Sequence, residues 1–292
     1  MFNGIMTLSP SLSRSAPFVA LLLNWSGEAL AIDYLERSAD FAVLAGSTVM
    51  TTGVTTINGD IGVSPGTAFT VTGTLNHIGA VHIADAVAGL AWTDATNAFN
   101  ALAALTPTTN LTGFDLGLVG VLTPGVYRFD TTAQLTGALT LDYASDPGGA
   151  FIFQIGSALT TASGASVITL NGSAGSGLYW NVGSAATLGS GTIFAGNILA
   201  QSAITLGPGA SIVCGRAIAL TGAVTMVGNT ISNDCGGAGG YSIIGGDFGS
   251  SGFLGAAVAA DAVPEPASWA LMIVGFSLIG AAVRRRGVVP AA

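Results

Sequence analysis

The feature that most constrains the fold of this chain is a threonine-led segment that recurs four times in its second half. The segments begin at Thr160, Thr187, Thr205 and Thr225, at spacings of 27, 18 and 20 residues. A unit of about 20 residues with short apolar-alternating strands and glycine corners is typical of a β-solenoid. Glycine suits the corners because it accepts backbone angles that other residues resist. The repeat predicts a mainly β fold, an irregular right-handed β-solenoid (β-helix) over residues 39–232.

One alanine-rich stretch, residues 79–105, breaks the β pattern. Its apolar residues recur at helical spacing, at Ile83, Val87, Leu90, Ala91, Ala95, Phe99 and Leu102. Thr106-Pro107 then ends the pattern. A helix of about 26 residues is roughly 39 Å long, which matches about eight strand layers. We therefore expect one long α-helix packed alongside the solenoid.

The C-terminal segment, residues 263–286, has the features of a membrane boundary. An uncharged, mostly apolar run over residues 267–283 reaches roughly 26 Å as a helix, the short end of what crosses a bilayer core. The run is flanked by Val263, Pro264, Glu265 and Pro266 before it and by Arg284, Arg285 and Arg286 after it. The three arginines favour an orientation in which the C-terminal end of the run lies on the cytoplasmic side of the membrane. The segment resembles the PEP-CTERM sorting signal, which implies export, recognition by a membrane-embedded exosortase and cleavage near Pro-Glu-Pro. The alternatives are an ordinary C-terminal transmembrane anchor helix and a buried core helix, and the three arginines and the Pro-x-Pro argue against the core helix.

The beginning of the chain has the pattern of an export signal. Arg14 precedes an apolar run over residues 16–23, and Ala29-Leu30-Ala31 supplies a small-x-small cleavage pattern. Residues 1–31 are therefore predicted to be a signal peptide. A stretch rich in Gly, Ser and Ala, residues 236–262, is predicted to be a flexible linker between the domain and the C-terminal segment. This organisation places the protein at the cell surface, in the outer envelope or in the extracellular matrix, transiently or stably anchored by its C-terminal segment.

The two cysteines, Cys214 and Cys235, are predicted to form a disulfide. Two thiols in an exported chain favour a disulfide over a metal site, and no Cys-x-x-Cys motif or histidine cluster accompanies them. The alternative is two separate buried thiols.

Composition excludes one large class of partners. The chain has no lysine, only 8% charged residues and a net charge of −8, so it lacks the basic patch that nucleic-acid binding requires. An average soluble domain carries roughly 25% charged residues. The polar surface of this domain must therefore be built from threonine, serine and asparagine.

The body of the chain resembles the microbial ice-binding domain, a discontinuous β-solenoid with a long flanking helix. The matching blocks, in family order, are residues 41–47, 56–66, 122–127, 151–156, 179–184 and 196–200. The resemblance covers roughly residues 39–232. It implies that the domain adsorbs to ice through a flat solenoid face, as an antifreeze or ice-adhesion protein.

Neither catalysis nor a cofactor is indicated by the sequence. His77 and His82, the only histidines, are five residues apart, so they do not share one face of a helix. The carboxylates are scattered singly rather than paired as glycoside hydrolysis requires. We therefore expect a protein that is not an enzyme and holds no metal.

Threonine is the more informative residue type, because a solenoid aligns equivalent residues of successive coils about 4.8 Å apart. A flat, uncharged array of methyl and hydroxyl groups can hold water in an ice-like arrangement. The family's ice-binding faces carry Thr-Ala/Gly-x-Thr/Asn motifs, and residues 52–55 fit this pattern. The ice-contacting candidates are Thr52, Thr55, Thr160, Thr187, Thr192, Thr205 and Thr225, with Thr192 and Thr230 as a second possible row. The expected partners are ice, the exosortase and the membrane; the alternative function is a cell-surface or biofilm-matrix adhesin that binds glycan or other cells.

Overall fold

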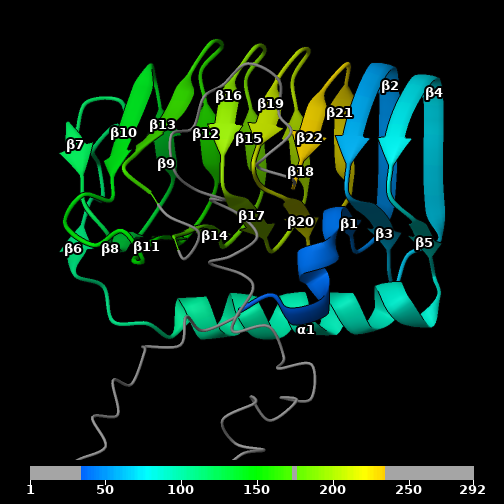
Figure 1. Ribbon diagram of the computed structural model, residues 1–292, viewed down its shortest axis with the longest axis horizontal. Coiled ribbons are helices and arrows are strands. Elements are labelled where there is room, and N and C mark those ends of the chain that lie inside the picture. Colours follow the sequence, from blue (N-terminus) through cyan, green and yellow to red (C-terminus); the bar gives the residue numbers. More distant parts are fainter. Residues whose placement is uncertain (1–33, 173–175, 234–292) are drawn as a thin grey trace, which may run out of the picture.

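The computed structural model describes residues 34–172 and 176–233, and these form a three-sided β-solenoid with an α-helix along one side (Figure 1). The strands lie in a nine-stranded sheet and a thirteen-stranded sheet, and all the described pairings are parallel. The predicted mainly β fold is therefore confirmed.

The nine-stranded sheet is the side against which the helix packs, and we call it the helix face. Its strands, in spatial order, are β5 (Val81–Ile83), β3 (Asp60–Val63), β1 (Phe41–Ala45), β20 (Ala217–Ala219), β17 (Asn197–Ala200), β14 (Gly177–Val182), β11 (Ala150–Ile155), β8 (Gly125–Phe129) and β6 (Thr109–Asn110). Side chains on the inner surface of this sheet enter the solenoid core, and those on the outer surface meet the helix.

The second side, which we call the threonine face, consists mainly of three-residue strands. Its strands are β9 (Ala133–Leu135), β12 (Leu159–Thr161), β15 (Ala186–Leu188), β18 (Ile204–Leu206), β21 (Val224–Val227) and the first halves of β2 (Thr48–Asn58) and β4 (Ala68–Ile78). In each of the five short strands a residue that points outward lies between two buried residues.

The third face completes the triangle. Its strands are β7 (Val121–Leu122), β10 (Ala138–Asp142), β13 (Ser166–Leu170), β16 (Ile193–Ala195), β19 (Ser211–Val213), β22 (Thr230–Ser232) and the second halves of β2 and β4. Both long strands continue from the threonine face onto the third face. They turn the corner at Gly53 and Gly73, which have φ values of 72° and 120°, and a Cβ at Gly73 would collide with the backbone of Gly53.

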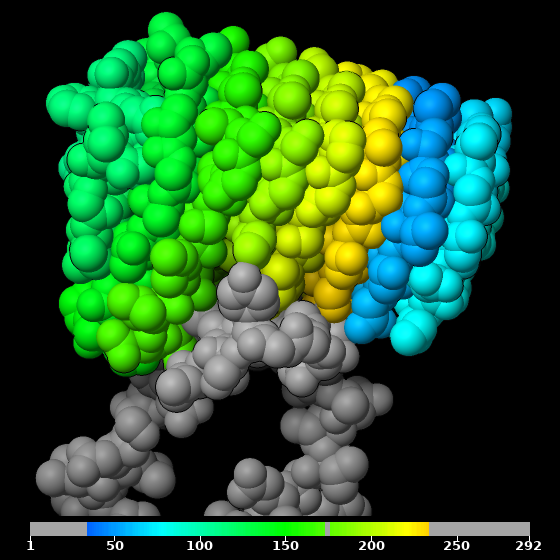
Figure 2. Space-filling model, turned by 90° about the horizontal axis from the view of Figure 1, so that it is seen from above, coloured from blue at the N-terminus to red at the C-terminus, as the bar shows by residue number. Residues whose placement is uncertain are grey.

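The order of the coils along the solenoid differs from their order in the sequence. β1 pairs with β20 on one side and with β3 on the other, so the first two coils of the chain stack on its last coil. In Figure 2 the coils appear as parallel ridges, and the yellow coil near residue 230 is followed directly by the blue coil near residue 50. The solenoid is therefore discontinuous in sequence.

The helix α1 (Ala86–Ala103) is shorter than the predicted range of 79–105. Residues 81–83 form β5, which adds a strand to the helix face, and the helix begins only after Asp85, whose carboxylate accepts a hydrogen bond of 2.8 Å from Ala88 N. Eighteen helical residues are about 27 Å long, which matches the six inter-strand spacings from β5 to β11. The helix therefore runs past fewer coils than the eight layers that were predicted.

The buried side of the helix consists mostly of alanine. Ala88, Ala91, Ala95 and Ala98 are buried with Leu102, whereas the predicted core positions Val87 and Leu90 are exposed. Small side chains let the helix lie close to the sheet, against the sheet residues Leu44, Ile152, Tyr179, Leu199 and Ile218. Asp94 is also buried and pairs with Arg37 at 3.0 Å, which ties the helix to the short 3₁₀ helix η1 (Glu36–Asp40). The sequence pattern therefore identified the helix and correctly placed Ala91, Ala95, Phe99 and Leu102 on its packed side, but it wrongly included Val87 and Leu90.

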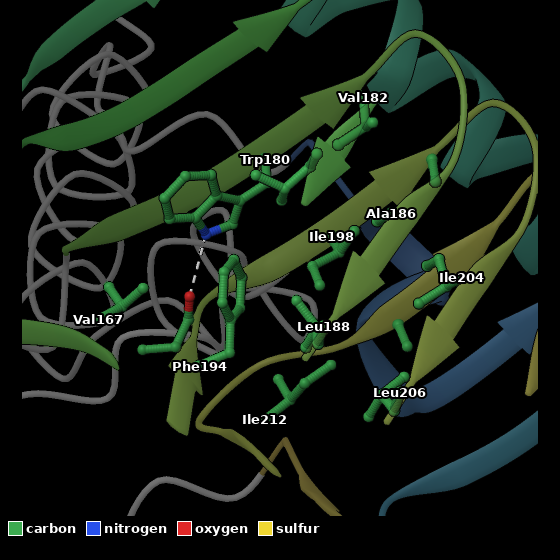
Figure 3. Close-up of a cluster of buried hydrophobic side chains, with 14 of the residues drawn as sticks. Val167, Trp180, Val182, Ala186, Leu188, Phe194, Ile198, Ile204, Leu206 and Ile212 are labelled. Carbon is green, nitrogen blue, oxygen red and sulfur yellow. Dashed lines mark hydrogen bonds between the residues drawn. The ribbon is translucent and has the colours of Figure 1, made fainter. Parts of the chain in front are cut away.

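The core inside the solenoid is a stack of aromatic and aliphatic side chains from successive coils (Figure 3). Trp180 is fully buried; its ring stacks on Phe153 with centroids 4.1 Å apart and lies 4.9 Å from that of Phe194. Its indole N–H donates to the carbonyl oxygen of Ala195 at 3.0 Å. This interaction satisfies the one polar group of the largest buried side chain.

The end of the solenoid next to β9 is closed by the connection between α1 and β7. Leu116 N donates to Gln134 O at 2.9 Å, so this connection pairs with the edge strand β9. The Asp115 carboxylate accepts hydrogen bonds from the side chain and backbone N–H of Thr136 and from Gly117 N. Partial burial raises the pKa of Asp115, but these hydrogen bonds to the carboxylate outweigh it and hold the pKa below its ordinary value.

This depressed pKa predicts a pH dependence of stability. The ionised Asp115 stabilises the fold above the unfolded-state pKa of about 3.9, and this contribution is lost as the pH falls through the lower folded-state pKa. We therefore expect Asp115→Asn to lower the melting temperature at pH 7 but to leave it close to that of the wild type near pH 2. Calorimetric scans of both proteins across this range test the expectation. An equal difference at both pH values would contradict it.

Cys214 is buried and disulfide-bonded. Its predicted partner, Cys235, lies outside the described residues, as do the predicted signal peptide (1–31), the linker (236–262) and the C-terminal segment (263–286). Within residues 34–172 and 176–233, neither helix is long and apolar enough to cross a membrane.

Candidate functional site

The centre of the threonine face carries an aligned row of hydroxyl side chains. Thr160 pairs in register with Thr187, Thr187 with Thr205, and Thr205 with Thr225. The first three are exposed and Thr225 is half-buried. Each is the central residue of an inward–outward–inward triplet, so the apolar neighbours on both sides fix its outward direction. Four threonines with three strand spacings extend over about 14 Å.

A second row, of alanines, lies two residues before the threonines and was not predicted. Hydrogen bonds from Leu159 N to Ala185 O, from Ala186 N to Ala203 O and from Ile204 N to Ala223 O link the coils here. The row consists of Ala158, Ala185, Ala203 and Ala223, all half-buried. Because these side chains are only methyl groups, the threonine row stands clear of its neighbours. The signal was visible in the sequence as an Ala-x-Thr triplet repeated at each threonine.

The row extends beyond the four threonines in both directions. Gln134 is the register partner of Thr160 at one end. At the other end Thr225 pairs with Met50, and Met50 pairs with Thr70 of the terminal coil. The full row thus has seven positions, about 29 Å from end to end, with Met50 as an apolar interruption. Met50 and Thr70 could not be placed from the repeat because they precede it by about 90 residues and join the row through the discontinuous stacking.

Two of the predicted ice-contacting residues are inside the solenoid. Thr55 is fully buried and bonded to the Thr51 hydroxyl at 2.6 Å. Thr192 is also fully buried, with its hydroxyl 2.8 Å from that of Thr161. Both hydroxyls sit at corners, where the chain turns and a polar side chain satisfies local hydrogen bonds. Neither can contact an external surface, and we leave both out of the candidate face.

Two other candidates lie on the surface but away from the central row. Thr52 is half-buried beside the row, and its hydroxyl donates to Met226 O at 3.3 Å. Thr230 is exposed on the third face, where it pairs with Ser211 and Thr56. On the coil beyond Ser211 the equivalent position is Ile193, so the third face lacks a continuous hydroxyl row.

The strand segments that form the threonine face contain no aspartate, glutamate, lysine, arginine or histidine. Their outward side chains offer methyl groups and neutral hydroxyl groups only, apart from Gln134 and Met50. These strand segments therefore place no carboxylate, imidazole, amine or guanidinium group on the face. It can order water through apolar contact and single hydrogen bonds repeated at a regular spacing.

The histidines occupy structural positions at the terminal coil. His77 is in β4, and its Nε2 lies 3.0 Å from Gly59 O. His82 is in β5, and its Nδ1 lies 2.8 Å from the Asp85 carboxylate. The described part of the chain has no group of three or more His, Cys, Asp or Glu side chains that could hold a metal ion.

The fold and the face together define a discontinuous β-solenoid with an in-register threonine row on one side. Residues 43–232 match the family model described as ice-binding-like. The chain belongs to this family. Residues 262–286, outside the described part of the chain, match the PEP-CTERM protein-sorting motif. Both resemblances expected from the sequence are thereby confirmed.

Similar proteins come from bacteria and fungi of several lineages. A protein of Nostoc sp. (strain HG1) named as an ice-binding protein is 50% identical over 208 residues, which cover 71% of this chain and 77% of the relative. An ice-binding protein of Flavobacterium frigoris (strain PS1) is 31% identical over 222 residues, 71% of this chain and 78% of the relative.

Two solved structures show the same fold. The crystal structure of an ice-binding protein from an Antarctic biological consortium has a TM-score of 0.63 at 40% identity, covering 68% of this chain and 90% of that one. The ice-binding protein of Antarctomyces psychrotrophicus has a TM-score of 0.60 at 33% identity, covering 68% and 96%.

Proposed function

We propose that this protein is an exported, surface-sorted ice-binding protein that adsorbs to ice through its threonine face. The observation that carries the proposal is the in-register row of Thr160, Thr187, Thr205 and Thr225 on a charge-free face. Membership in the ice-binding-like family and the 50% identity to the Nostoc protein support it.

Adsorption to a crystal differs from binding a small ligand because many weak contacts act together. Each threonine contributes one hydroxyl and one methyl, and the solenoid repeats this unit about every 4.8 Å. The backbone holds the units rigidly, so little conformational entropy is lost when the face orders water. Regular spacing and rigidity, rather than any single side chain, are therefore what the fold supplies to binding.

The sorting motif supports a location at the cell surface. The chain would be exported and recognised by an exosortase at Pro264-Glu265-Pro266. Residues 267–283 would hold it in the membrane, either permanently or until the exosortase cleaves the chain. The residues 236–262 that precede the motif are rich in Gly, Ser and Ala and would act as a flexible tether. A surface-held ice-binding domain could attach a cell to ice or restrain ice growth at its envelope. The protein itself would not be an enzyme.

An ice-recrystallisation assay tests the proposed function. Purified protein at micromolar concentration should keep ice grains small over hours at about −6 °C, while bovine albumin at equal mass should not. Absence of any inhibition or crystal shaping at all soluble concentrations would overturn the ice assignment. Binding of the same sample to a glycan array would then favour the adhesin alternative.

The interruption at Met50 gives a gain-of-function prediction. Met50 is 41% exposed between Thr225 and Thr70, so Met50→Thr would complete a hydroxyl row of six consecutive positions from Thr160 to Thr70. We expect ice-recrystallisation activity to rise by roughly two- to threefold, equivalent to less than about 1 kcal/mol. The matched control, Val227→Thr, adds a hydroxyl beside the row and should change activity less. Equal or lower activity of Met50→Thr would show that the face ends at Thr225.

A further inference from the structure

The end of the solenoid formed by β4 is open among the described strands. β4 is eleven residues long and pairs only with β2. β5 ends the helix face at the same end of the molecule and pairs only with β3 (Figure 1). The opposite end is closed by the connection through Asp115 and Leu116, as described above. An edge strand with free backbone groups is a template for pairing with another chain.

The direction of the free backbone groups follows from the pairing with β2. Gly59 N donates to Ile78 O at 2.8 Å, and the parallel register runs without a break over the whole strand. In a parallel ladder the backbone groups of alternate residues point to opposite sides. Even-numbered residues of β4 therefore bond toward β2. The odd-numbered residues direct N–H and C=O groups to the open side: Phe69, Val71, Gly73, Leu75 and His77.

β4 also lacks the devices that normally protect an edge. Residues 68–78 include no proline and no Asp, Glu, Lys or Arg. Phe69 and Leu75 are only partly buried against the core, while Val71 and Ile78 are 40% and 73% exposed. Within residues 34–172 and 176–233, β4 is thus the one strand that covers this end of the apolar core on these two faces. A second copy meets no charge repulsion along this edge.

The sequence of β4 is close to self-complementary about Thr72. In an antiparallel pairing centred there, Phe69 lies opposite the partner's Leu75 and Thr70 lies opposite the partner's Thr74. The odd-numbered residues that carry the free backbone groups then form the hydrogen-bonded pairs, and inward apolar side chains face inward apolar side chains. The bend at Gly73 lies one residue from the centre, opposite Val71 of the second copy.

From these observations we propose that two copies of this chain associate end to end through β4, as a two-fold symmetric dimer with antiparallel β4 strands centred on Thr72. A two-fold dimer is closed, so the open edge is used up and no filament grows. The second copy is favoured over another partner because, in this register, Phe69 faces Leu75, Thr70 faces Thr74 and Thr72 faces Thr72. This inference does not depend on ice binding.

A single-cysteine cross-link in the full chain tests the proposal and its register. In the proposed dimer the two Thr72 residues lie directly opposite as a pair without mutual hydrogen bonds, with Cα atoms about 4.5 Å apart. This separation is within the disulfide range of about 4.4–6.8 Å. Thr72→Cys should therefore give a covalent dimer on a non-reducing gel after air oxidation, and reductant should dissolve it.

The neighbouring position supplies the control. Two copies of Thr70 would lie four residues apart along the strands, about 14 Å, which is too far for a disulfide. Thr70→Cys alone should stay monomeric on the gel, while an equimolar mixture of Thr70→Cys and Thr74→Cys should cross-link. No covalent dimer from Thr72→Cys, or equal cross-linking of Thr72→Cys and Thr70→Cys, would overturn the proposal. The latter result would indicate contact through another part of the chain.

A second variant separates association from folding. Val71→Lys places a cation at the open end of the core in each copy, where the dimer would bury it. Sedimentation of the full chain should show the wild-type dimer dissociating in this variant, with far-UV circular dichroism unchanged. A wild type that sediments as a monomer at tens of micromolar would also overturn the proposal. Absence of ice binding in the wild type or in Val71→Lys would count against the proposed function but not against the proposed dimer.

Discussion

Replacing Thr205 with tyrosine is expected to reduce ice-recrystallisation inhibition by at least about tenfold, which corresponds to about 1.4 kcal/mol. Thr205 lies between Thr187 and Thr225 in the row, and its side chain is exposed. A bulky ring there would hold the face away from the crystal over several rungs at once. The melting temperature should stay nearly unchanged, because an outward side chain supports little packing. Grain-size measurements across a dilution series, with a parallel thermal scan, test both statements.

The third face provides the matched control for this substitution. Thr230 is exposed on a strand of similar length and register, but it lies outside the threonine face. Thr230→Tyr should therefore retain wild-type activity. If Thr205→Tyr kept full inhibition of ice recrystallisation and Thr230→Tyr lost it, the ice-binding site would lie on the third face instead.

Replacing Trp180 with alanine is expected to have the largest effect on stability. The side chain is fully buried, stacks on Phe153 and donates a hydrogen bond to Ala195 O. Truncation of a buried tryptophan costs about 3–5 kcal/mol, because the cavity is only partly refilled. For a domain of about 200 residues this corresponds to a fall in melting temperature of roughly 10 °C.

Two further variants test whether the loss of stability in Trp180→Ala comes from lost packing in the core rather than from shortening a large side chain at any position. Trp180→Phe should cost less than Trp180→Ala, because an aromatic ring still fills most of the space against Phe153. Leu118→Ala removes a side chain that is 81% exposed and should leave the melting temperature within about 1 °C of the wild type. If the melting temperature of Trp180→Ala fell as little as that of Leu118→Ala, this result would contradict the packing described for the core.

The sequence allowed the repeat to be identified because its physical cause is local. Each short strand has a buried–exposed–buried pattern, so the outward threonines between residues 160 and 225 recur in register with the coils. Glycine corners and the alanine-rich helix are likewise visible over short windows. The fold class and most of the central row could therefore be predicted without coordinates.

What could not be predicted depends on long-range stacking and on burial. The stacking of β1 and β2 on the last coil brings Met50 beside Thr225, and no local pattern indicates this. Thr55 and Thr192 have the composition of surface threonines but turn inward at corners, where neighbouring hydroxyls satisfy them. The helix was predicted too long because the alanine-rich stretch also supplies β5, and tertiary pairing with β3 overrides helical propensity there.

Direct partition into growing ice tests the central claim most simply. A fluorescently labelled sample of the purified protein is placed around a chilled probe, and the label inside the resulting ice hemisphere is compared with that in the liquid. We predict enrichment of the wild type and of Thr230→Tyr in the ice, and exclusion of a variant in which Thr187, Thr205 and Thr225 are all replaced with tyrosine. Exclusion of the wild type, or equal incorporation of all three proteins, would contradict adsorption through the threonine face.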